Sequence, residues 1–338
     1  MPCSRRGLLA GALLALAGCG TATGPGGTAS PGAGASGTAA PGSAKKPVIG
    51  LTYIPNIQFA PFYWGVAKQL YQPEVELRHH GEREGLFTAL LTGQEQLVVA
   101  GGDEMLAARA ESDADLVTVA TLYRTHPVRA IVLQDSPVTS FADLKGRKVG
   151  LPGRYGENWF ALRLGLARAG LGESDVEIVD IGYTQQAALV TRKVDAVMGF
   201  VNGDAVQLSE SGNPVRSLSP GDLPLVSASL VTTGAYAQAN RELVAAVARG
   251  TVAGMRGVVD QPEEAVELAR AYVPALAEAG AATYARAVLR ETATLYQDAD
   301  RQISGTVDTA RWDEMSKTLH QAGLIKKDVP ASQSVWQG

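Results

Sequence analysis

Aromatic and amide side chains gather at the ends of several expected strands, and their chemistry is suited to holding a flat ring. The densest group, which follows the first expected strand, comprises Tyr53, Asn56, Gln58, Phe59, Phe62 and Tyr63. Aromatic faces can stack on a flat ring, and amide groups can form hydrogen bonds with its polar edge. Such a density is unusual in a chain with 6% aromatic residues. An alternative is that Phe59, Phe62 and Tyr63 pack in the core beneath the following helix.

Further candidates for ligand contact lie at later strand ends. In Gly101-Gly102-Asp103-Glu104, a glycine turn leads into a helix, and its free backbone N–H groups could hold a ligand acceptor. Asp103 could instead merely cap that helix. The other candidates are Tyr123, Arg154, Tyr155, Asn158, Trp159, Tyr183, Gln185, Asn202 and Asp204. Arg154 could equally be a solvated surface charge, and His126, near the first crossover, could belong to a hinge or to the core.

Patterns typical of catalysis or of metal binding are not found in the sequence. It has no Gly-x-Ser-x-Gly motif, phosphate-binding loop or zinc-ligand helix. Its two cysteines, Cys3 and Cys19, both lie in the first 19 residues, which excludes a disulfide framework or a cysteine metal site in the folded part. A net charge of −4 without a basic run disfavours binding to nucleic acid. We therefore expect a binding protein with no catalytic residues, no metal and no cofactor.

The elements that must position these residues alternate along the chain. In the first part, strands are expected at 47–54, 75–79, 97–100, 117–122 and 128–133. Helices are expected between them, including one over 84–92, which favours parallel βαβ units. A second part repeats this alternation, with strands at 147–151, 176–181 and 196–200. A last strand near 225–233 precedes helices over 241–259, 263–272, 277–296 and 312–322.

This order predicts an α/β fold with two lobes. The chain would begin in lobe one over residues 47–134 and form lobe two over 135–224. It would then return to complete lobe one over 225–330, leaving a tail at 331–338. The two crossovers would form a hinge and leave a cleft between the lobes. Ligands are held in such clefts, beyond the carboxyl ends of the strands.

The first 46 residues are typical of export and tethering. Arg5 and Arg6, an apolar run over 7–17 and a small-residue ending at Cys19 predict a signal peptide over 1–19. The Gly, Ala, Ser, Thr and Pro residues of 20–46 can bury little and predict a flexible tether. The ending Leu-Ala-Gly-Cys resembles a bacterial lipobox, which implies that Cys19 is lipidated and anchors the chain to the outside of the cell membrane. The two arginines also resemble a twin-arginine signal, so the route of export stays open.

Three stretches resemble one subgroup of solute-binding proteins: residues 53–63, residues 101–104 and the run from Phe141 to Gly150. The subgroup includes binding proteins for thiamine-precursor pyrimidines, riboflavin and aliphatic sulfonates, and also the enzymes that make the thiamine pyrimidine. The likeness covers roughly residues 47–330. It implies a two-lobed, type-two periplasmic-binding-protein fold. It also implies a substrate-binding lipoprotein, which we expect to be a monomer, with an ABC permease in the membrane as its partner.

The subgroup offers several ligands and one enzymatic alternative. A thiamine-precursor pyrimidine is the first hypothesis, because a buried Glu104 or Asp204 could accept hydrogen bonds from its amino groups. Riboflavin is the second, because a wide aromatic cleft suits three rings; sulfonates would favour a more basic cleft. In the subgroup an acidic residue follows the asparagine directly, whereas Gly203 separates Asn202 from Asp204, which puts the role of Asp204 in doubt. The synthases carry a cysteine-rich iron motif that is absent here, so an enzyme is disfavoured; a ligand sensor or a structural lipoprotein is a third hypothesis.

Overall fold

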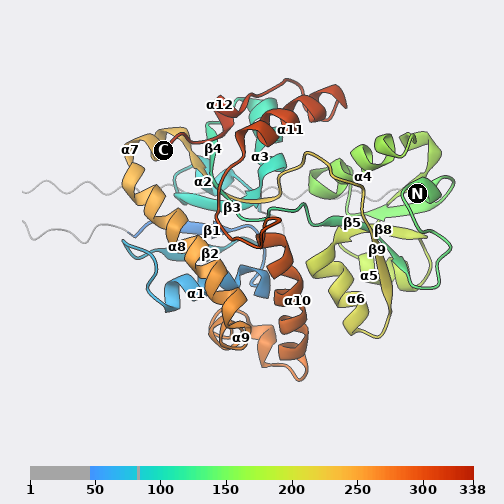
Figure 1. Ribbon diagram of the computed structural model, residues 1–338, viewed down its shortest axis with the longest axis horizontal. Helices are drawn as coiled ribbons and strands as arrows, with labels where there is room; N and C mark the ends of the chain where they lie inside the picture. The colour runs from blue at the N-terminus through green and yellow to red at the C-terminus, as the bar shows by residue number, and fades with distance from the viewer. Residues whose placement is uncertain (1–45, 82–83) are drawn as a thin grey trace, which may run out of the picture. The chain divides into compact units, whose positions relative to one another are not determined.

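The computed structural model describes residues 46–81 and 84–338, and from residue 46 onwards these belong to one compact unit. The predicted signal peptide, the lipidation of Cys19 and all but the last residue of the predicted tether lie outside the described residues. The strands form two mixed five-stranded sheets with helices packed on them, as Figure 1 shows. No helix in the described part of the chain combines the length and the apolar character needed to cross a membrane.

The first sheet has the strand order β2-β1-β3-β10-β4. Its strands are β1 (Val48–Leu51), β2 (Glu76–His79), β3 (Leu97–Gly101), β4 (Leu116–Thr121) and β10 (Ala228–Thr233). The strand β1 is parallel to β2 and β3, whereas β10 runs antiparallel to both β3 and β4. Every residue of β1 and β3 is buried, as expected for strands covered by helices on both faces of a sheet.

The second sheet has the strand order β7-β6-β8-β5-β9. Its strands are β5 (Val128–Leu133), β6 (Lys148–Leu151), β7 (Glu177–Asp180), β8 (Ala196–Phe200) and β9 (Val215–Leu218). The placement of β5 differs from the predicted boundary at residue 134, because β5 pairs antiparallel with β8 and β9 of this sheet. Two apolar strands that follow one another so closely look like neighbours in one sheet, yet the chain passes to the second sheet between β4 and β5.

The helices cover the sheets and complete the core. They are α1 (Ala60–Ala67), α2 (Thr88–Leu91), α3 (Gly102–Ser112), α4 (Gly156–Arg168), α5 (Gln185–Val190), α6 (Val206–Glu210), α7 (Gly234–Ala239), α8 (Arg241–Asp260), α9 (Pro262–Ala269), α10 (Ala281–Tyr296), α11 (Thr309–Gln321) and α12 (Ala331–Ser334). The expected helix over 84–92 is shorter and begins at Thr88. The expected tail at 331–338 instead contains α12, after which the Trp336 N–H donates to the Thr118 carbonyl of β4 at 2.9 Å. Two apolar residues at the end of a chain give too little pattern to predict that contact.

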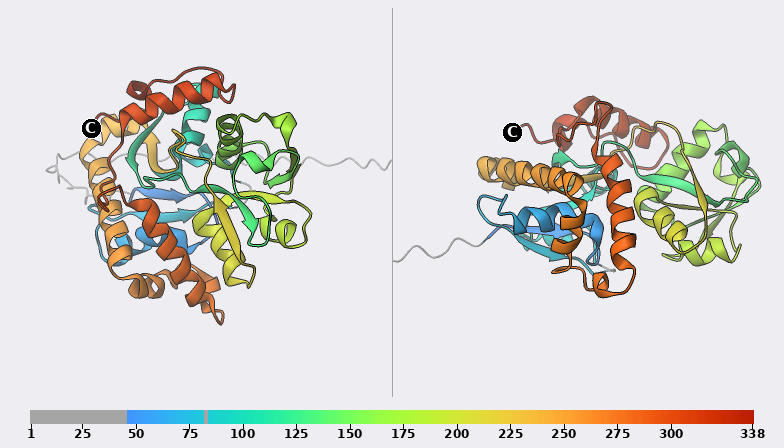
Figure 2. Two further views of the ribbon diagram at one scale, coloured as in Figure 1. Left: turned by 45° about the vertical axis from the view of Figure 1, so that its right-hand side comes forward. Right: turned by 60° about the horizontal axis from the view of Figure 1, so that its bottom comes forward.

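One apolar core joins elements of the two sheets and positions the strand ends near each other. Met105 and Leu106 of α3, Phe160 of α4 and Trp312 of α11 belong to the same buried cluster. Figure 2 shows α10 standing between the helices of the first sheet and α6 of the second, and α10 packs against both α8 and α6. Helix α3, which begins directly after β3, packs against α4, so the carboxyl end of β3 lies close to the start of α4.

Candidate functional site

A cavity of about 430 Å³ lies where strands of the two sheets end. The first sheet contributes the residues after β1, β3 and β4 and the start of β10. The second contributes the residues after β6, β7 and β8. Small-molecule sites have volumes of about 300–1,000 Å³ and are typically found at such strand ends. The cavity is thus the candidate binding site.

Twelve of the residues predicted as ligand contacts line this cavity. They are Tyr53, Asn56, Gln58, Phe59, Phe62, Glu104, Tyr123, Tyr155, Asn158, Tyr183, Gln185 and Asp204. Six segments that follow different strands therefore converge on one space. The remaining six predicted contacts are Tyr63, Gly102, Asp103, Arg154, Trp159 and Asn202, and they lie outside the lining.

Exposed tyrosines from the second sheet stand at the cavity. Tyr155 is 58% exposed and Tyr183 is 66% exposed, although both are large aromatic residues. They follow β6 and β7, and the Tyr155 hydroxyl lies 3.5 Å from that of Tyr183. Tyr53, from the loop after β1, is 39% exposed and lines the same space. Neighbouring exposed rings of this kind can cover a flat ligand from both sheets.

An amide acceptor faces the same space without a protein partner. The Asn158 Oδ1 is buried, and no described residue donates a hydrogen bond to it. A buried acceptor without a donor is costly, so a ligand N–H or O–H group could satisfy it. Asn56 differs, because its Oδ1 already accepts the Gln58 N–H at 2.9 Å and fixes the turn before α1.

Tyr63 and Trp159 pack in the core, in contrast to their prediction as stacking residues. Tyr63 is fully buried, and its ring stacks on Tyr272 with centroids 4.4 Å apart. Trp159 is 8% exposed, with the guanidinium of Arg154 at 5.6 Å and that of Arg163 at 5.2 Å from its ring. Arg154 is an exposed residue that pairs with Glu173 at 3.1 Å, which matches the alternative of a surface charge.

The start of α3 does not offer the free N–H groups that the glycine turn suggested. The Gly102 N–H donates to the Ser227 carbonyl at 2.9 Å, and the Asp103 N–H donates to the Val226 carbonyl at 2.8 Å. The Glu104 N–H donates to Asp103 Oδ1 at 2.8 Å. The carbonyls of the segment just before β10 thus accept from the N–H groups that an anion would need.

Asn202 joins separate parts of the fold instead of lining the cavity. It is completely buried, and its Nδ2 donates to the Tyr123 hydroxyl at 3.1 Å and to Thr292 Oγ1 at 2.9 Å. Asn202 follows β8 of the second sheet, Tyr123 follows β4 of the first sheet, and Thr292 lies on α10. Gln58 Nε2 also donates to the Asn202 carbonyl at 3.4 Å. These bonds link the two sheets beside the cavity.

Asp204 shapes the turn after β8. Its Oδ2 accepts the Phe200 N–H at 2.8 Å, across the π-helical turn Val201–Ala205. Burial raises the pKa of Asp204 to about 6. A Cβ added to the inserted Gly203 would lie 3.2 Å from Gln58 Nε2, so the Gln58 side chain would have to shift by a few tenths of an ångström. Asp204 therefore supports the backbone of this wall of the cavity.

Glu157 is the main residue that the sequence did not predict at the site. It is 7% exposed, lines the cavity, and its Oε1 accepts the Ser227 hydroxyl at 2.6 Å. Burial raises the pKa of Glu157 well above its usual range, and the neighbouring Asp103 charge adds to this rise. In sequence it looks like a solvated acid in the first turn of a helix, which is a common position for Glu.

The carboxyls of Asp103 and Glu104 lie close to that of Glu157, next to Gly101. A Cβ added to Gly101 would lie 2.7 Å from Glu157 Oε1, 2.8 Å from Asp103 Oδ1 and 2.9 Å from Glu104 Oε2. Burial raises the pKa of Asp103 to about 8, and burial together with the charge of Asp103 raises that of Glu104 to about 8. We call Asp103, Glu104 and Glu157 the acid cluster. It is a group of carboxyls that share one desolvated space.

His126 borders the acid cluster as a neutral base. Its Nε2 lies 3.3 Å from Asp103 Oδ2, and burial lowers the pKa of His126 to about 4. Donor atoms of Asp103, His126 and Glu157 come within 4.8 Å of one another. Because His126 and Asp103 hydrogen bond to each other and Glu157 to Ser227, these groups satisfy one another and we assign no metal to them.

Residues from the helical part also line the cavity and were not predicted. They are Met255 of α8, Tyr284 and Tyr296 of α10, and Gln207 of α6. Tyr296 packs against Tyr123 with ring centroids 5.7 Å apart. A helical pattern alone does not show which of its residues face a distant loop, so these positions carried no signal in the sequence.

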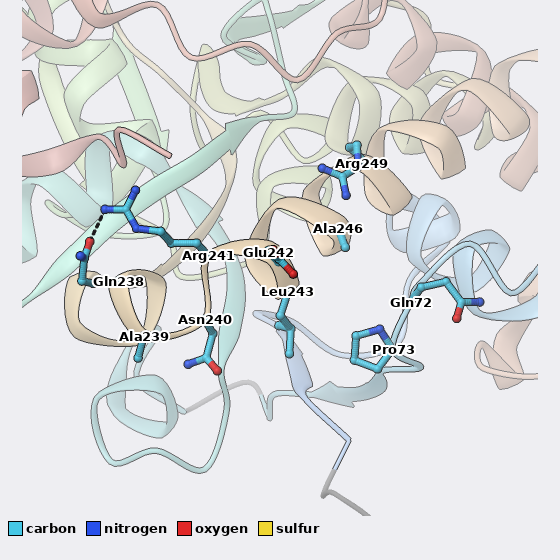
Figure 3. Close-up of a pocket in the computed structure, with 10 residues that line it drawn as sticks. All are labelled: Gln72, Pro73, Gln238, Ala239, Asn240, Arg241, Glu242, Leu243, Ala246 and Arg249. Atoms are coloured by element: carbon cyan, nitrogen blue, oxygen red, sulfur yellow. Dashed lines mark hydrogen bonds between the residues drawn. The ribbon is translucent and has the colours of Figure 1, made fainter.

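A second hollow lies away from the strand ends, between the turn before β2 and the start of α8. Figure 3 shows its lining, which includes Gln72, Pro73, Asn240 and Arg249. None of the lining residues is aromatic, and Arg241 donates a hydrogen bond to Gln238 at its rim. Without converging rings or buried polar groups, this hollow lacks the features of a small-molecule site.

Sequence comparisons identify relatives of the chain. Residues 56–265 match the protein family described as NMT1/THI5 like. The chain is 31% identical over 294 residues to the riboflavin-binding protein RibY of Chloroflexus aurantiacus, which covers 85% of this chain and 83% of that protein. It is 27% identical over 181 residues to the formylaminopyrimidine-binding protein of Halalkalibacterium halodurans, covering 52% and 54%. A synthase from Legionella pneumophila, named for 4-amino-5-hydroxymethyl-2-methylpyrimidine phosphate, is 27% identical over 45% of this chain and 49% of its own.

Structural comparison identifies the fold. The periplasmic aliphatic sulphonate binding protein SsuA from Escherichia coli superposes with a TM-score of 0.68 at 21% identity, covering 87% of this chain and 98% of that chain. A Candida albicans protein described as having the generic periplasmic binding protein fold superposes with a TM-score of 0.60 at 14% identity, covering 86% and 96%. The predicted α/β periplasmic-binding-protein fold is thereby confirmed.

Proposed function

Because the chain belongs to the NMT1/THI5 like family, we propose that it is the extracytoplasmic solute-binding component of an ABC importer. The observation that carries this proposal is the cavity at the strand ends of both sheets, with Tyr53 on one side and Tyr155 and Tyr183 on the other. The two sheets would act as lobes hinged at residues 122–127 and 219–227, closing on the solute as such proteins do. The closed form would then dock on a membrane permease, with Cys19 as the lipid anchor of a monomer.

Riboflavin is the solute that the cavity favours. About 430 Å³ lined by several rings suits a three-ring system, whereas a single pyrimidine ring would leave much of the space empty. The relative that covers 85% of this chain carries the name of a riboflavin-binding protein. We infer a binding role because the relative that covers 85% of this chain is named as a binding protein.

A thiamine-precursor pyrimidine is the alternative solute. A relative that covers 52% of this chain is named for a formylaminopyrimidine, and the buried carboxyls of the cavity could accept hydrogen bonds from its amino group if they were ionised. This alternative predicts tight binding of a single ring, which a competition experiment distinguishes.

Titration of the purified protein with riboflavin tests the proposal. Flavin fluorescence should fall on binding as the ring stacks on tyrosine, and the melting temperature should rise by mass action. Tyr155→Ala and Tyr183→Ala should each weaken binding by about fivefold, because each loses one stacked ring contact of about 1 kcal/mol. Tyr236→Ala, on α7 outside the cavity, is the matched control and should leave binding unchanged.

The outcomes separate the competing functions. Binding of an aminopyrimidine with no response to riboflavin would replace the proposed solute by the alternative. Binding of neither ring, with a response to a sulfonate only, would refute the heteroaromatic proposal. Unchanged riboflavin affinity in both tyrosine variants would show that the ligand lies elsewhere.

A further inference from the structure

The acid cluster stands at the wall of the binding cavity and draws its members from both sheets. Asp103 and Glu104 lie in the first turn of α3, directly after β3 of the first sheet. Glu157 lies in the first turn of α4, directly after the loop that follows β6 of the second sheet. Glu104 and Glu157 both line the cavity, and Asp103 is completely buried behind them. A ligand in the cavity would therefore contact the carboxyls of Glu104 and Glu157.

The carboxyl of Glu104 occupies the space that a side chain at either of two glycine positions would need. Glu104 Oε2 lies 2.9 Å from the position of a Cβ on Gly101, and Glu104 Oε1 lies 2.6 Å from that of a Cβ on Gly156. Gly101 belongs to β3 and Gly156 begins α4, so Glu104 reaches from one sheet to the other. The Glu104 carboxyl therefore lies between the end of β3 and the start of α4.

The acid cluster has no ion-paired Lys or Arg in residues 46–81 and 84–338, although Arg129 and Arg311 are close enough to His126 to lower its pKa. No Lys or Arg there forms an ion pair with Asp103, Glu104 or Glu157. The nearest base is His126, which burial keeps neutral by lowering its pKa to about 4. The Arg129 guanidinium donates to the carbonyls of His126 and Val128, and Arg311 pairs with Asp222 at 2.9 Å.

The other ionisable groups that act on the cluster are tyrosines. Tyr123 faces it from the segment after β4, and Tyr183 from the segment after β7. Burial raises the pKa of Tyr123, so its hydroxyl stays neutral beside Glu157. If all three converging carboxyls were ionised, their buried charges would have no ion-pair partner and would destabilise the folded protein. This destabilisation is smaller if the carboxyls keep their protons. An uncharged carboxyl can donate a hydrogen bond, whereas a carboxylate can only accept one.

We propose that Glu104 and Glu157 act as uncharged carboxylic acids that donate hydrogen bonds to the carbonyl oxygens of the solute, so that the site selects a dione ring over an amino-substituted ring. The proposal rests on the proposed function. The unpartnered Asn158 Oδ1 supplies an acceptor beside these donors. Two donors and an acceptor complement an edge on which an imide N–H stands between two carbonyls, as in the pyrimidinedione ring of a flavin. An aminopyrimidine offers an amine donor in place of one carbonyl, so the carboxyl O–H that faces it loses its acceptor.

The pH dependence of binding tests this assignment. Riboflavin affinity should fall by about tenfold or more between pH 7 and pH 9.5, because ionisation of the cluster removes a donor and leaves a buried acceptor of the ligand unpaired. Glu104→Gln keeps an N–H donor but cannot ionise there, so it should flatten this profile. Glu104→Leu removes the donor and should weaken binding at every pH. Glu263→Gln, on the exposed surface of α9, is the matched control and should show the wild-type profile.

Competition with 4-amino-5-hydroxymethyl-2-methylpyrimidine provides the opposing test. The aminopyrimidine should bind at least about tenfold more weakly than riboflavin at pH 7. Tighter aminopyrimidine binding that rises with pH and disappears in Glu104→Gln would overturn the assignment, since it would mean that the carboxylate accepts. A riboflavin profile that is flat in the wild type would also overturn it. Binding of neither ring at any pH refutes the proposed function and this inference together, whereas the two preceding results refute only the inference.

Discussion

Asn202 offers the most direct test of how the two sheets are held around the cavity. Its Nδ2 makes two hydrogen bonds, at 3.1 Å to the Tyr123 hydroxyl and at 2.9 Å to Thr292 Oγ1. Asn202→Leu has a similar volume and removes both. A neutral hydrogen bond contributes about 1 kcal/mol, so the two together contribute about 2 kcal/mol to the form of the protein in which they exist. That free energy corresponds to a factor of about 30 in an equilibrium constant.

The loss should appear in ligand affinity if the bonds belong to the closed form. A ligand that binds only the closed form loses apparent affinity in proportion to the population of that form. Isothermal titration with riboflavin at pH 7 should therefore give a dissociation constant about 30-fold higher for Asn202→Leu than for the wild type. Thermal unfolding, followed by circular dichroism, checks that the variant is folded at the temperature of the titration.

A matched variant separates this effect from a general effect of the substitution. Asn213→Leu removes an asparagine whose Nδ2 donates to the Ser211 carbonyl nearby in the chain at 3.1 Å. It should bind riboflavin as the wild type does. An affinity of Asn202→Leu within about threefold of the wild type, in a folded variant, would refute the reasoning, because the two bonds would then contribute equally to the open and closed forms.

Three further predictions concern stability. Gly101→Ala should lower the free energy of unfolding by about 1–3 kcal/mol, measured by urea unfolding. Its φ of −61° suits any residue, but its Cβ would lie within 2.9 Å of three carboxyl oxygens. Unchanged stability would mean that the carboxyls of the acid cluster can move aside. Trp159→Ala should cost about 3–5 kcal/mol in the same assay, as expected of a core residue, and a loss below about 1 kcal/mol would contradict its assignment to the core. The melting temperature should fall as the pH rises from 7 to 9, since Asp103 and Glu104, with pKa values raised to about 8, hold protons in the folded chain that the unfolded chain has released. A melting temperature that does not fall over this range would show that both carboxyls are already ionised in the folded chain at pH 7, because groups ionised in both states contribute no pH dependence.

The tendency of ligands to bind beyond the carboxyl ends of strands explains how much of the site the sequence could predict. Aromatic and amide residues that follow the ends of strands, such as Tyr53, Tyr155 and Tyr183, do line the cavity, because parallel strands of one sheet end at one edge. The same tendency cannot tell which residue of the next helix turns inward. Trp159 is one example, since α4 begins at Gly156 and so directs this ring into the shared core.

Pairing between distant strands accounts for most of what could not be predicted. The apolar pattern of β5 is equally compatible with either sheet, and only its antiparallel pairing with β8 and β9 decides the matter. The blocked N–H groups of Gly102 and Asp103 have the same origin, because their acceptors come from the segment just before β10. Glu157 was missed for a related reason: its carboxyl is buried by contact with Ser227, 70 positions further along the chain.

The position of β10 also has a consequence for how the protein is made. This strand lies between β3 and β4, although more than 100 residues separate it from either along the chain. The first sheet thus remains incomplete, with a gap between β3 and β4, until synthesis has passed Thr233. The second sheet uses one uninterrupted stretch from β5 to β9 and needs nothing that comes later. A nascent chain can therefore form the second sheet while the first sheet still lacks β10. Because pairing β10 with β3 and β4 closes a loop of more than 100 residues, the first sheet should form more slowly.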